Sequence, residues 1–180
     1  MINKNKKVNT VWKKVEARWP VYAYREQINF NAIKDKVEDF LNKKEVFPET
    51  FSHFGFVVKS IEKSMEILEI LEKKSLGKLK KGWVEAYKVY VGRIMLDDKE
   101  IEFIEPAGES FFYKFLKEEG EGLHHLAFQV NNVKSCFKKL KKKGVETIDK
   151  EPRCGSHGKV AFFRPGLFDS MCIELFQKYK

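Results

Sequence analysis

Two kinds of side chain that bind metal ions recur at a constant spacing in this sequence. His53 and His125 lie 72 residues apart, and Glu102 and Glu174 are separated by the same interval. Two imidazoles and two carboxylates form a ligand set for a divalent cation, and this set suits Co, Ni, Zn or Mn. The repeat therefore predicts that two copies of one unit meet and build a metal site.

Each copy begins with a segment typical of a strand and continues into a helix. Residues 51–58 and 123–130 are rich in apolar residues, and alternation over them is typical of strands. Both segments are followed by apolar residues at helical spacing, which are Ile61, Met65 and Leu68 in one copy and Val133, Phe137 and Leu140 in the other. Gly144 stands where a glycine commonly ends a helix.

Short strand candidates complete both copies. They are 83–91, 93–96 and 100–104 in the first copy and 145–148, 159–163 and 171–176 in the second. The unit is therefore β-α-β-β-β, used twice, and we expect an α+β fold in which two tandem modules pair to bury an exposed sheet face.

The repeat also predicts the boundaries within the chain. Module one is expected at 50–107, a linker at 108–121 with a helix over 109–117, and module two at 122–178, so that 50–180 forms one domain.

The first 49 residues lie outside the repeat, and we predict an N-terminal extension of undetermined structure. Residues 33–41 have the pattern of a short helix, and the aromatic residues between 12 and 24 argue against pure disorder. The segment either packs on the domain, contacts a second copy or covers the active site. The first two interpretations need no special residues and are preferred.

Composition indicates a folded globular protein. The chain is 43% hydrophobic and contains 16 Phe, which suffices for a core, and it has no apolar run of the roughly 20 residues that span a bilayer. The lysine-rich start has no apolar segment of signal-peptide length behind it, so we expect a cytoplasmic protein without a membrane partner. Three cysteines without a CxxC pair indicate reduced thiols.

The net charge of +9 raises the question of a nucleic-acid partner. Lysines cluster at 78–81 and 138–143, but the second cluster lies on the polar face of the predicted helix, and no groove-reading motif accompanies it. We therefore expect a solvated surface and no nucleic-acid partner. The charge is compatible with a phosphate-bearing small molecule such as a coenzyme A ester.

Two such modules, each with His on its first strand and Glu on its last, resemble the vicinal oxygen chelate superfamily. This superfamily includes glyoxalase I, extradiol dioxygenases and methylmalonyl-CoA epimerases. The epimerases are the most similar group over residues 51–177, and the blocks that carry the likeness are 101–106, 119–130, 143–145 and 151–159.

The resemblance implies a divalent metal between the modules, held by His53, Glu102, His125 and Glu174. It also implies proton abstraction beside a thioester carbonyl, with the cation stabilising the enolate and two bases inverting the carbon. Glu174 matches the residue proposed as one of the two bases in the epimerases. Glu85 matches a glutamate of some epimerases and is the candidate for the second base. Strand alternation leaves open whether the side chain of Glu85 faces the cavity or solvent.

The loop that contains His157 resembles a substrate-binding element of the epimerases. Backbone N–H groups at Gly155 and Gly158 are expected to meet anionic groups there. By strand alternation, His124 should face away from the ligand His125. Dimers are common in this superfamily, so a homodimer is a further expectation.

The sequence departs from the epimerase pattern in three places. Ser52 stands where Asp is frequent, Arg164-Pro165-Gly166 replaces His-Pro-Lys, and the hairpin at 165–171 differs from a glycine-rich turn. These departures leave substrate identity open. A glyoxalase I-like lyase is the alternative enzyme, because it uses the same four ligands, and a metal-free small-molecule binding module of the superfamily is the alternative class. A dioxygenase is disfavoured, since its iron is bound by two His and one carboxylate.

Overall fold

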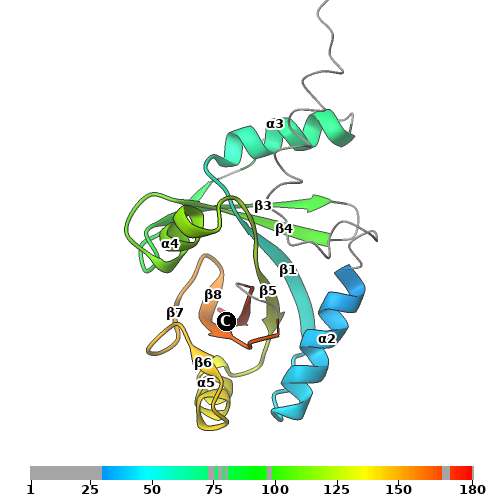
Figure 1. Ribbon diagram of the computed structural model, residues 1–180, viewed down its shortest axis with the longest axis vertical. Coiled ribbons are helices and arrows are strands. Elements are labelled where there is room, and N and C mark those ends of the chain that lie inside the picture. The colour runs from blue at the N-terminus through cyan, green and yellow to red at the C-terminus, as the bar shows by residue number, and fades with distance from the viewer. Residues whose placement is uncertain are drawn as a thin grey trace, which may run out of the picture.

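The computed structural model describes residues 30–72, 76, 79, 81–96, 99–167 and 171–179. Within these residues the strands form one nine-stranded sheet that curls around an interior (Figure 1). The strand order is β2-β3-β4-β1-β5-β9-β8-β6, and β7 pairs with β8. The aromatic segment before residue 30 and part of the first lysine cluster lie outside the described residues.

The elements follow the predicted repeat, except that the second module has one additional two-residue strand, Arg153–Cys154. The first module contains β1 (Thr50–Val57), α3 (Ile61–Glu72), β2 (Gly82–Val84), β3 (Val89–Leu96) and β4 (Lys99–Pro106). The second contains β5 (Gly122–Gln129), α5 (Val133–Lys142), β6 (Glu146–Thr147), β7 (Arg153–Cys154), β8 (Gly158–Arg164) and β9 (Cys172–Lys178). Helix α4 (Phe111–Glu118) joins them, and α2 (Phe30–Lys43) precedes both. The predicted α+β class and paired modules are confirmed.

Local signals explain where the helices begin and end. The side chain of Ser110 accepts a hydrogen bond from the backbone N–H of Tyr113 at the start of α4. Asn132 does the same for Ser135 at the start of α5. Gly144 has a φ of +77°, a conformation that favours glycine, so its predicted role after α5 is confirmed.

One strand prediction was wrong. Residues 83–91 form a hairpin, in which β2 ends at Val84 and β3 begins at Val89. The turn between them is closed by hydrogen bonds from the N–H groups of Tyr87 and Lys88 to the carbonyl oxygens of Val84 and Glu85. Because the chain reverses here, alternation does not carry through from Val84 to Val89.

The two modules pair edge to edge in the middle of the sheet. Strand β1 runs antiparallel to β5, while β4 is parallel to β1 and β9 is parallel to β5. The arrangement has approximate twofold symmetry about the β1–β5 pair. The first and last strands of both modules, which carry the predicted ligands, therefore occupy the four central places of the sheet.

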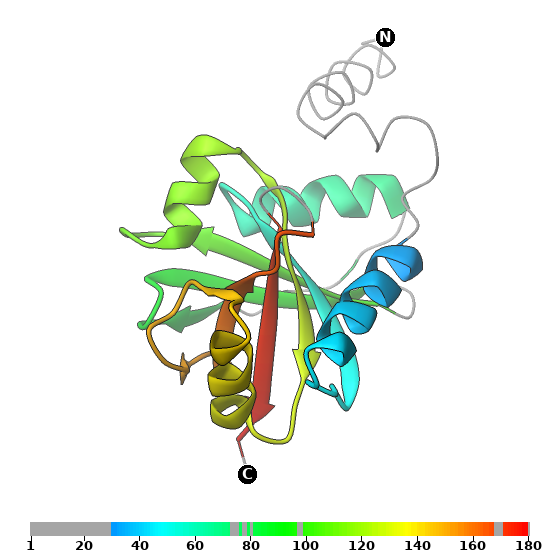
Figure 2. The same cartoon turned by 60° about the horizontal axis from the view of Figure 1, so that its bottom comes forward.

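Three apolar clusters stabilise the sheet. One joins α2 and α5 to β1, β5, β8 and β9, and it includes Val37, Leu41, Phe54, Leu126 and Phe137. Figure 2 shows these two helices on the half of the sheet near the C-terminus. The predicted helix at 33–41 is confirmed with longer bounds, and its buried face packs on the domain.

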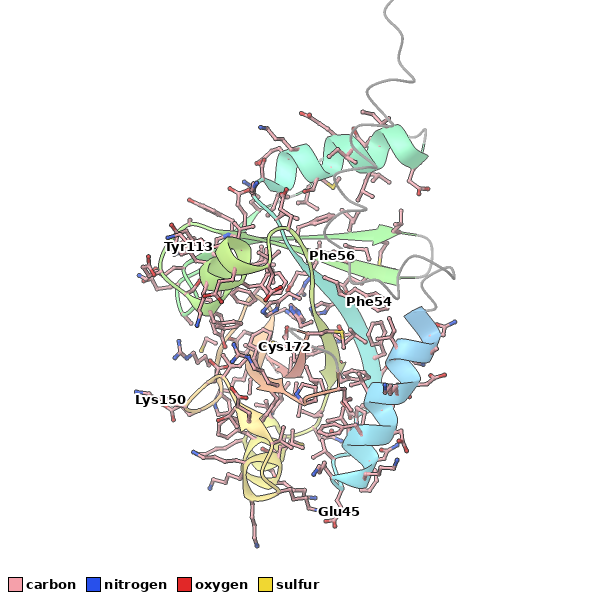
Figure 3. All side chains as sticks on the ribbon, in the orientation of Figure 1. Glu45, Phe54, Phe56, Tyr113, Lys150 and Cys172 are labelled. Atoms are coloured by element: carbon pink, nitrogen blue, oxygen red, sulfur yellow. The ribbon has the colours of Figure 1, made fainter. Side chains whose placement is uncertain are left out.

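The other two clusters lie on opposite faces of the sheet in the first module. Helix α3 packs outside through Ile61 and Met65 against Phe103. Helix α4 packs inside through Phe112, near Val91 and Phe162. Side chains fill the curl of the sheet in Figure 3, where the labelled Cys172 of β9 lies near the middle of the view. Over the described parts of the chain, no helix has the length and apolar character needed to cross a bilayer.

Candidate metal centre

The four predicted ligands meet inside the curled sheet. His53 and His125 have no exposed surface, and Glu102 and Glu174 are 4% and 3% exposed. The two Nε2 atoms lie 3.4 Å apart. Glu174 Oε2 lies 3.0 Å from Nε2 of His125 and 3.7 Å from that of His53. Glu102 Oε2 lies 3.7 Å and 3.5 Å from the same two nitrogens.

These donor atoms fit one divalent cation. All four lie within 4.8 Å of one another. Ligands about 2.1 Å from a shared ion are about 3.0 to 3.4 Å apart when adjacent, and the separations of 3.0 to 3.7 Å between histidine nitrogens and glutamate oxygens are close to this range. Imidazole nitrogen and carboxylate oxygen are both donors that Co, Ni, Zn and Mn accept. The residues therefore match the predicted ion in type and in spacing.

The strand register explains why the ligands converge. In each parallel pair, the glutamate lies two residues beyond the partner of the histidine, since His53 pairs with Glu100 and His125 with Cys172. Across the central pair, a small residue faces each imidazole. Gly55 is opposite His125, and Ala127 is opposite His53. A Cβ at Gly55 would lie 2.0 Å from Cε1 of His125, so the imidazole needs a glycine there.

The electrostatics of the metal-free cluster are dominated by the two carboxylates. Burial by itself lowers the pKa of His53, but Glu102 and Glu174 outweigh it and raise this pKa to about 9. Burial by itself raises the pKa of Glu102, yet His53 and Arg93 bring it to about 2. The two imidazoles likewise hold the pKa of Glu174 well below its usual range. Both glutamates are therefore negatively charged and suited to a cation.

Arg93 is a site residue that the sequence reasoning missed. It lies on β3 opposite Glu102, and its Nε donates to Glu102 Oε1 at 2.8 Å. Its Nη2 also contacts that oxygen and donates to Ser156 Oγ at 3.1 Å. The register of the β3–β4 hairpin was the signal that could have found it. In the second module, Phe162 lies opposite Glu174, so the two glutamates have different neighbours.

A cavity that opens to solvent lies beside the cluster, and Glu102 and Glu174 form part of its lining. Its walls are mostly apolar, from strands β2, β3, β4, β8 and helix α4. Its polar lining groups are Arg93, Glu102, Glu174, Ser156, His157 and Tyr87. An apolar wall with few polar groups is typical of ligand sites.

The predicted substrate loop is only partly at the cavity. His157 and Gly155 line it. Nε2 of His157 is buried without a hydrogen-bond partner, and burial together with Arg93 lowers the pKa of this imidazole to about 4. The N–H of Gly155 is not available for an anion, since it donates to the carbonyl oxygen of Gly158.

Gly158 does not line the cavity, contrary to its predicted role in substrate binding. A Cβ there would lie 2.2 Å from the carbonyl oxygen of Gln177. Glycine is therefore needed at this position for the close approach of β8 to β9.

Glu85 lies outside the cavity, so the structure does not support its predicted role as a base. It occupies the turn between β2 and β3, and its side chain is 70% exposed. Its carboxylate forms an ion pair with Lys88 and accepts a hydrogen bond from Nε1 of Trp83 at 2.7 Å. Lys88 and Trp83 also hold its pKa below the usual value. The reversal of the chain at this turn separates Glu85 from the inward face of β3.

His124 does not face away from His125, although strand alternation had predicted that it would. The β1–β5 register shifts between Leu123 and His125, which leaves His124 in a β-bulge. Its Nδ1 lies 3.1 Å from Nδ1 of His125, and its ring packs on Phe112, so the two histidines do not face opposite sides. Burial and the neighbouring His125 hold the pKa of His124 well below 6.5.

Comparison with known proteins agrees with this fold and with the paired modules. The family model described as Glyoxalase/Bleomycin resistance protein/Dioxygenase superfamily matches residues 52–163. The chain belongs to this superfamily. An uncharacterized protein, YqjC, of Bacillus subtilis is 34% identical over 125 residues, which are 68% of this chain and 88% of that protein.

Several relatives within the superfamily are named as epimerases. The mitochondrial methylmalonyl-CoA epimerase of Dictyostelium discoideum is 34% identical over 93 residues, 50% of this chain and 54% of that protein. The ethylmalonyl-CoA/methylmalonyl-CoA epimerase of Cereibacter sphaeroides is 35% identical over 88 residues, 47% of this chain and 66% of that protein. The matches to these epimerases thus span about half to two thirds of their length.

Solved structures show the same fold. A variant of Streptomyces coelicolor methylmalonyl-CoA epimerase in complex with 2-nitronate-propionyl-CoA has a TM-score of 0.64 and 22% identity. The match covers 74% of this chain and 99% of that one. A hypothetical protein from Bacillus halodurans has a TM-score of 0.59 and 27% identity, over 73% of this chain and 95% of that one.

Proposed function

We propose that this protein is a divalent-metal-dependent enzyme that removes and returns the proton alpha to a thioester carbonyl, as a methylmalonyl-CoA epimerase does. The observation that carries the proposal is the convergence of His53, Glu102, His125 and Glu174 beneath an apolar cavity. The epimerase relatives support the same reaction, and a coenzyme A thioester is the substrate class that their names suggest.

In this proposal the four ligands hold the cation, and the cavity walls hold the acyl group. When bound, the cation supplies the positive charge that stabilises an enolate oxygen. Glu174 accepts the alpha proton from one face of the carbon, and inversion requires that a proton return to the opposite face. The apolar wall around Phe162 and Val91 lowers the polarity of the cavity, which strengthens electrostatic interactions there. Arg93 and the unpaired Nε2 of His157 provide polar contacts for the substrate.

A glyoxalase I-like lyase remains the second candidate, because of one observation. Glu85 lies outside the cavity, so the second base predicted from the epimerase pattern does not reach the acyl group in this conformation. A reaction in which one ligand carboxylate moves the proton between adjacent carbons needs no such residue. A metal-free binding module is disfavoured, because it gives no reason for two buried glutamates beside two buried histidines.

The test is deuterium incorporation at C2 of methylmalonyl-CoA in heavy water, with Co²⁺-loaded protein, EDTA-stripped protein and a Glu174→Gln variant. Metal-dependent exchange would support enolisation, and its loss in a Glu174→Gln variant shown to retain Co²⁺ would support Glu174 as the base. Absence of exchange by protein shown to hold its metal would overturn the epimerase proposal. Turnover of the hemithioacetal of methylglyoxal and glutathione by the same preparation would then favour the lyase.

A further inference from the structure

Each of the two ligand histidines is contacted at Nδ1 by the side chain of the residue that precedes it. Ser52 Oγ lies 3.0 Å from Nδ1 of His53, and Nδ1 of His124 lies 3.1 Å from Nδ1 of His125. Ser52 and His124 are 72 residues apart, as the ligands are. Both stand where the β1–β5 register shifts, so both modules have a bulge at the same place. A bulge turns two consecutive side chains to one side of the sheet, which makes these contacts accessible.

Metal binding determines the direction of the hydrogen bond between the two histidines. His125 offers Nε2 to the cluster, and a nitrogen that binds a cation carries no proton. The proton of a neutral His125 is therefore on Nδ1, which donates to Nδ1 of His124. His124 must then present a bare nitrogen and keep its own proton on Nε2.

The surroundings of His124 suit a neutral acceptor. The side chain is buried, with 2% of the residue exposed, and its ring lies 4.9 Å from that of Phe112 and 4.8 Å from that of Phe115. Phe111 adds a third ring at 5.5 Å. An imidazolium would be poorly solvated among these rings, and it would have no lone pair to accept the proton of His125. Helix α4, which supplies the rings, thus keeps His124 in an apolar shell.

We infer that His124 is a positioning residue that fixes the tautomer and orientation of His125 and thereby strengthens metal binding at this site. The inference rests on the metal-binding part of the proposed function and is independent of the substrate. Ser52 plays the same part for His53, but it is half-buried and within reach of water. Loss of His124 should therefore cost more than loss of Ser52, because water can replace the hydroxyl but cannot enter the aromatic shell.

The experiment compares His124→Phe and His124→Asn, with Ser52→Ala as the first-module counterpart. Phenylalanine fills the volume but has no acceptor. Asparagine keeps an oxygen close to the position of Nδ1 but leaves space in the aromatic shell. Co²⁺ affinity is measured by competition with a chelator, and the free energy of unfolding is measured on the metal-free variants.

We expect His124→Phe to fold and to bind Co²⁺ about 10- to 100-fold more weakly, as loss of an outer hydrogen-bond partner does. His124→Asn should bind Co²⁺ more tightly than His124→Phe, although it should be the less stable protein. A merely structural role predicts the reverse order of affinities. Wild-type affinity in His124→Phe would overturn the inference while leaving the metal site intact, whereas wild-type protein that fails to bind Co²⁺ would overturn both.

Discussion

Gly55→Ala is the smallest change that should disable the metal site from outside the ligand set. The added Cβ would lie 2.0 Å from Cε1 and 2.3 Å from Nε2 of His125. Non-bonded carbon atoms prefer about 3.5 Å, so the imidazole must move by about 1.5 Å. Ligand distances at a metal site tolerate only about 0.2 Å, and His125 is therefore lost as a ligand.

Two magnitudes follow from this displacement. Overpacking in a buried strand costs about 1 to 3 kcal/mol, which should appear in the free energy of unfolding of the metal-free protein. Co²⁺ affinity should fall by more than the roughly 10- to 100-fold that loss of an outer partner costs, because a direct ligand is removed. Chemical denaturation measures the first quantity, and chelator competition measures the second.

Gly122→Ala is the matched control, because Gly122 lies on the same strand as His125 and a Cβ there meets no atom within 4 Å. It should bind Co²⁺ as the wild type does and change stability by less than about 0.5 kcal/mol. The repeat partner of Gly55 is Ala127, which already carries a Cβ opposite His53. Tight Co²⁺ binding by Gly55→Ala would refute the reasoning, since it would mean that the His125 imidazole can bind the ion from a different position.

Three further predictions concern the site. His125→Ala and Glu174→Ala should each abolish metal retention while leaving a folded protein by circular dichroism, and a metal-replete variant of either kind would contradict the ligand set. Glu85→Gln should leave deuterium exchange within about twofold of wild type, because general-base catalysis, worth about 10²- to 10⁴-fold, is not expected from a residue outside the cavity. A loss of that size would restore Glu85 to the mechanism. In metal-free protein the pKa of His53 is raised from 6.5 to about 9, so its contribution to stability is complete below pH 6.5 and is lost as pH rises through 9. The free energy of unfolding should fall across that window by up to about 1.4 kcal/mol per pH unit. Co²⁺ affinity should rise across the same window, because the ion displaces the proton of His53. A stability that does not change with pH would contradict the raised pKa of His53.

Local patterns were sufficient for the elements of the repeat. Apolar residues at helical spacing predicted α3 and α5, alternation predicted β1 and β5, and Gly144 predicted the end of α5. The constant spacing of the ligands added long-range information. Duplicated units fold alike, so the strand that carries His and the strand that carries Glu pair in the same way in both modules. This is why the sequence alone brought His53, Glu102, His125 and Glu174 together.

The sequence did not predict features that depend on how a strand pairs with its neighbour. Alternation assumed one strand over 83–91, and only the hairpin turn shows that Glu85 leaves the inward face. Arg93 has no neighbour in sequence that suggests a role. It becomes a site residue through the β3–β4 register, which places it opposite Glu102.

The bulges in the central strand pair were equally hidden from the sequence. The sequence by itself determined the two modules, their order and the identity of the ligands, since these depend on periodicity and on the repeat. Only the tertiary structure decided the neighbours of those ligands: Arg93 beside Glu102, Gly55 beneath His125 and His124 behind it. Cross-strand pairing and a one-residue register shift set these contacts, and both depend on two distant segments at once.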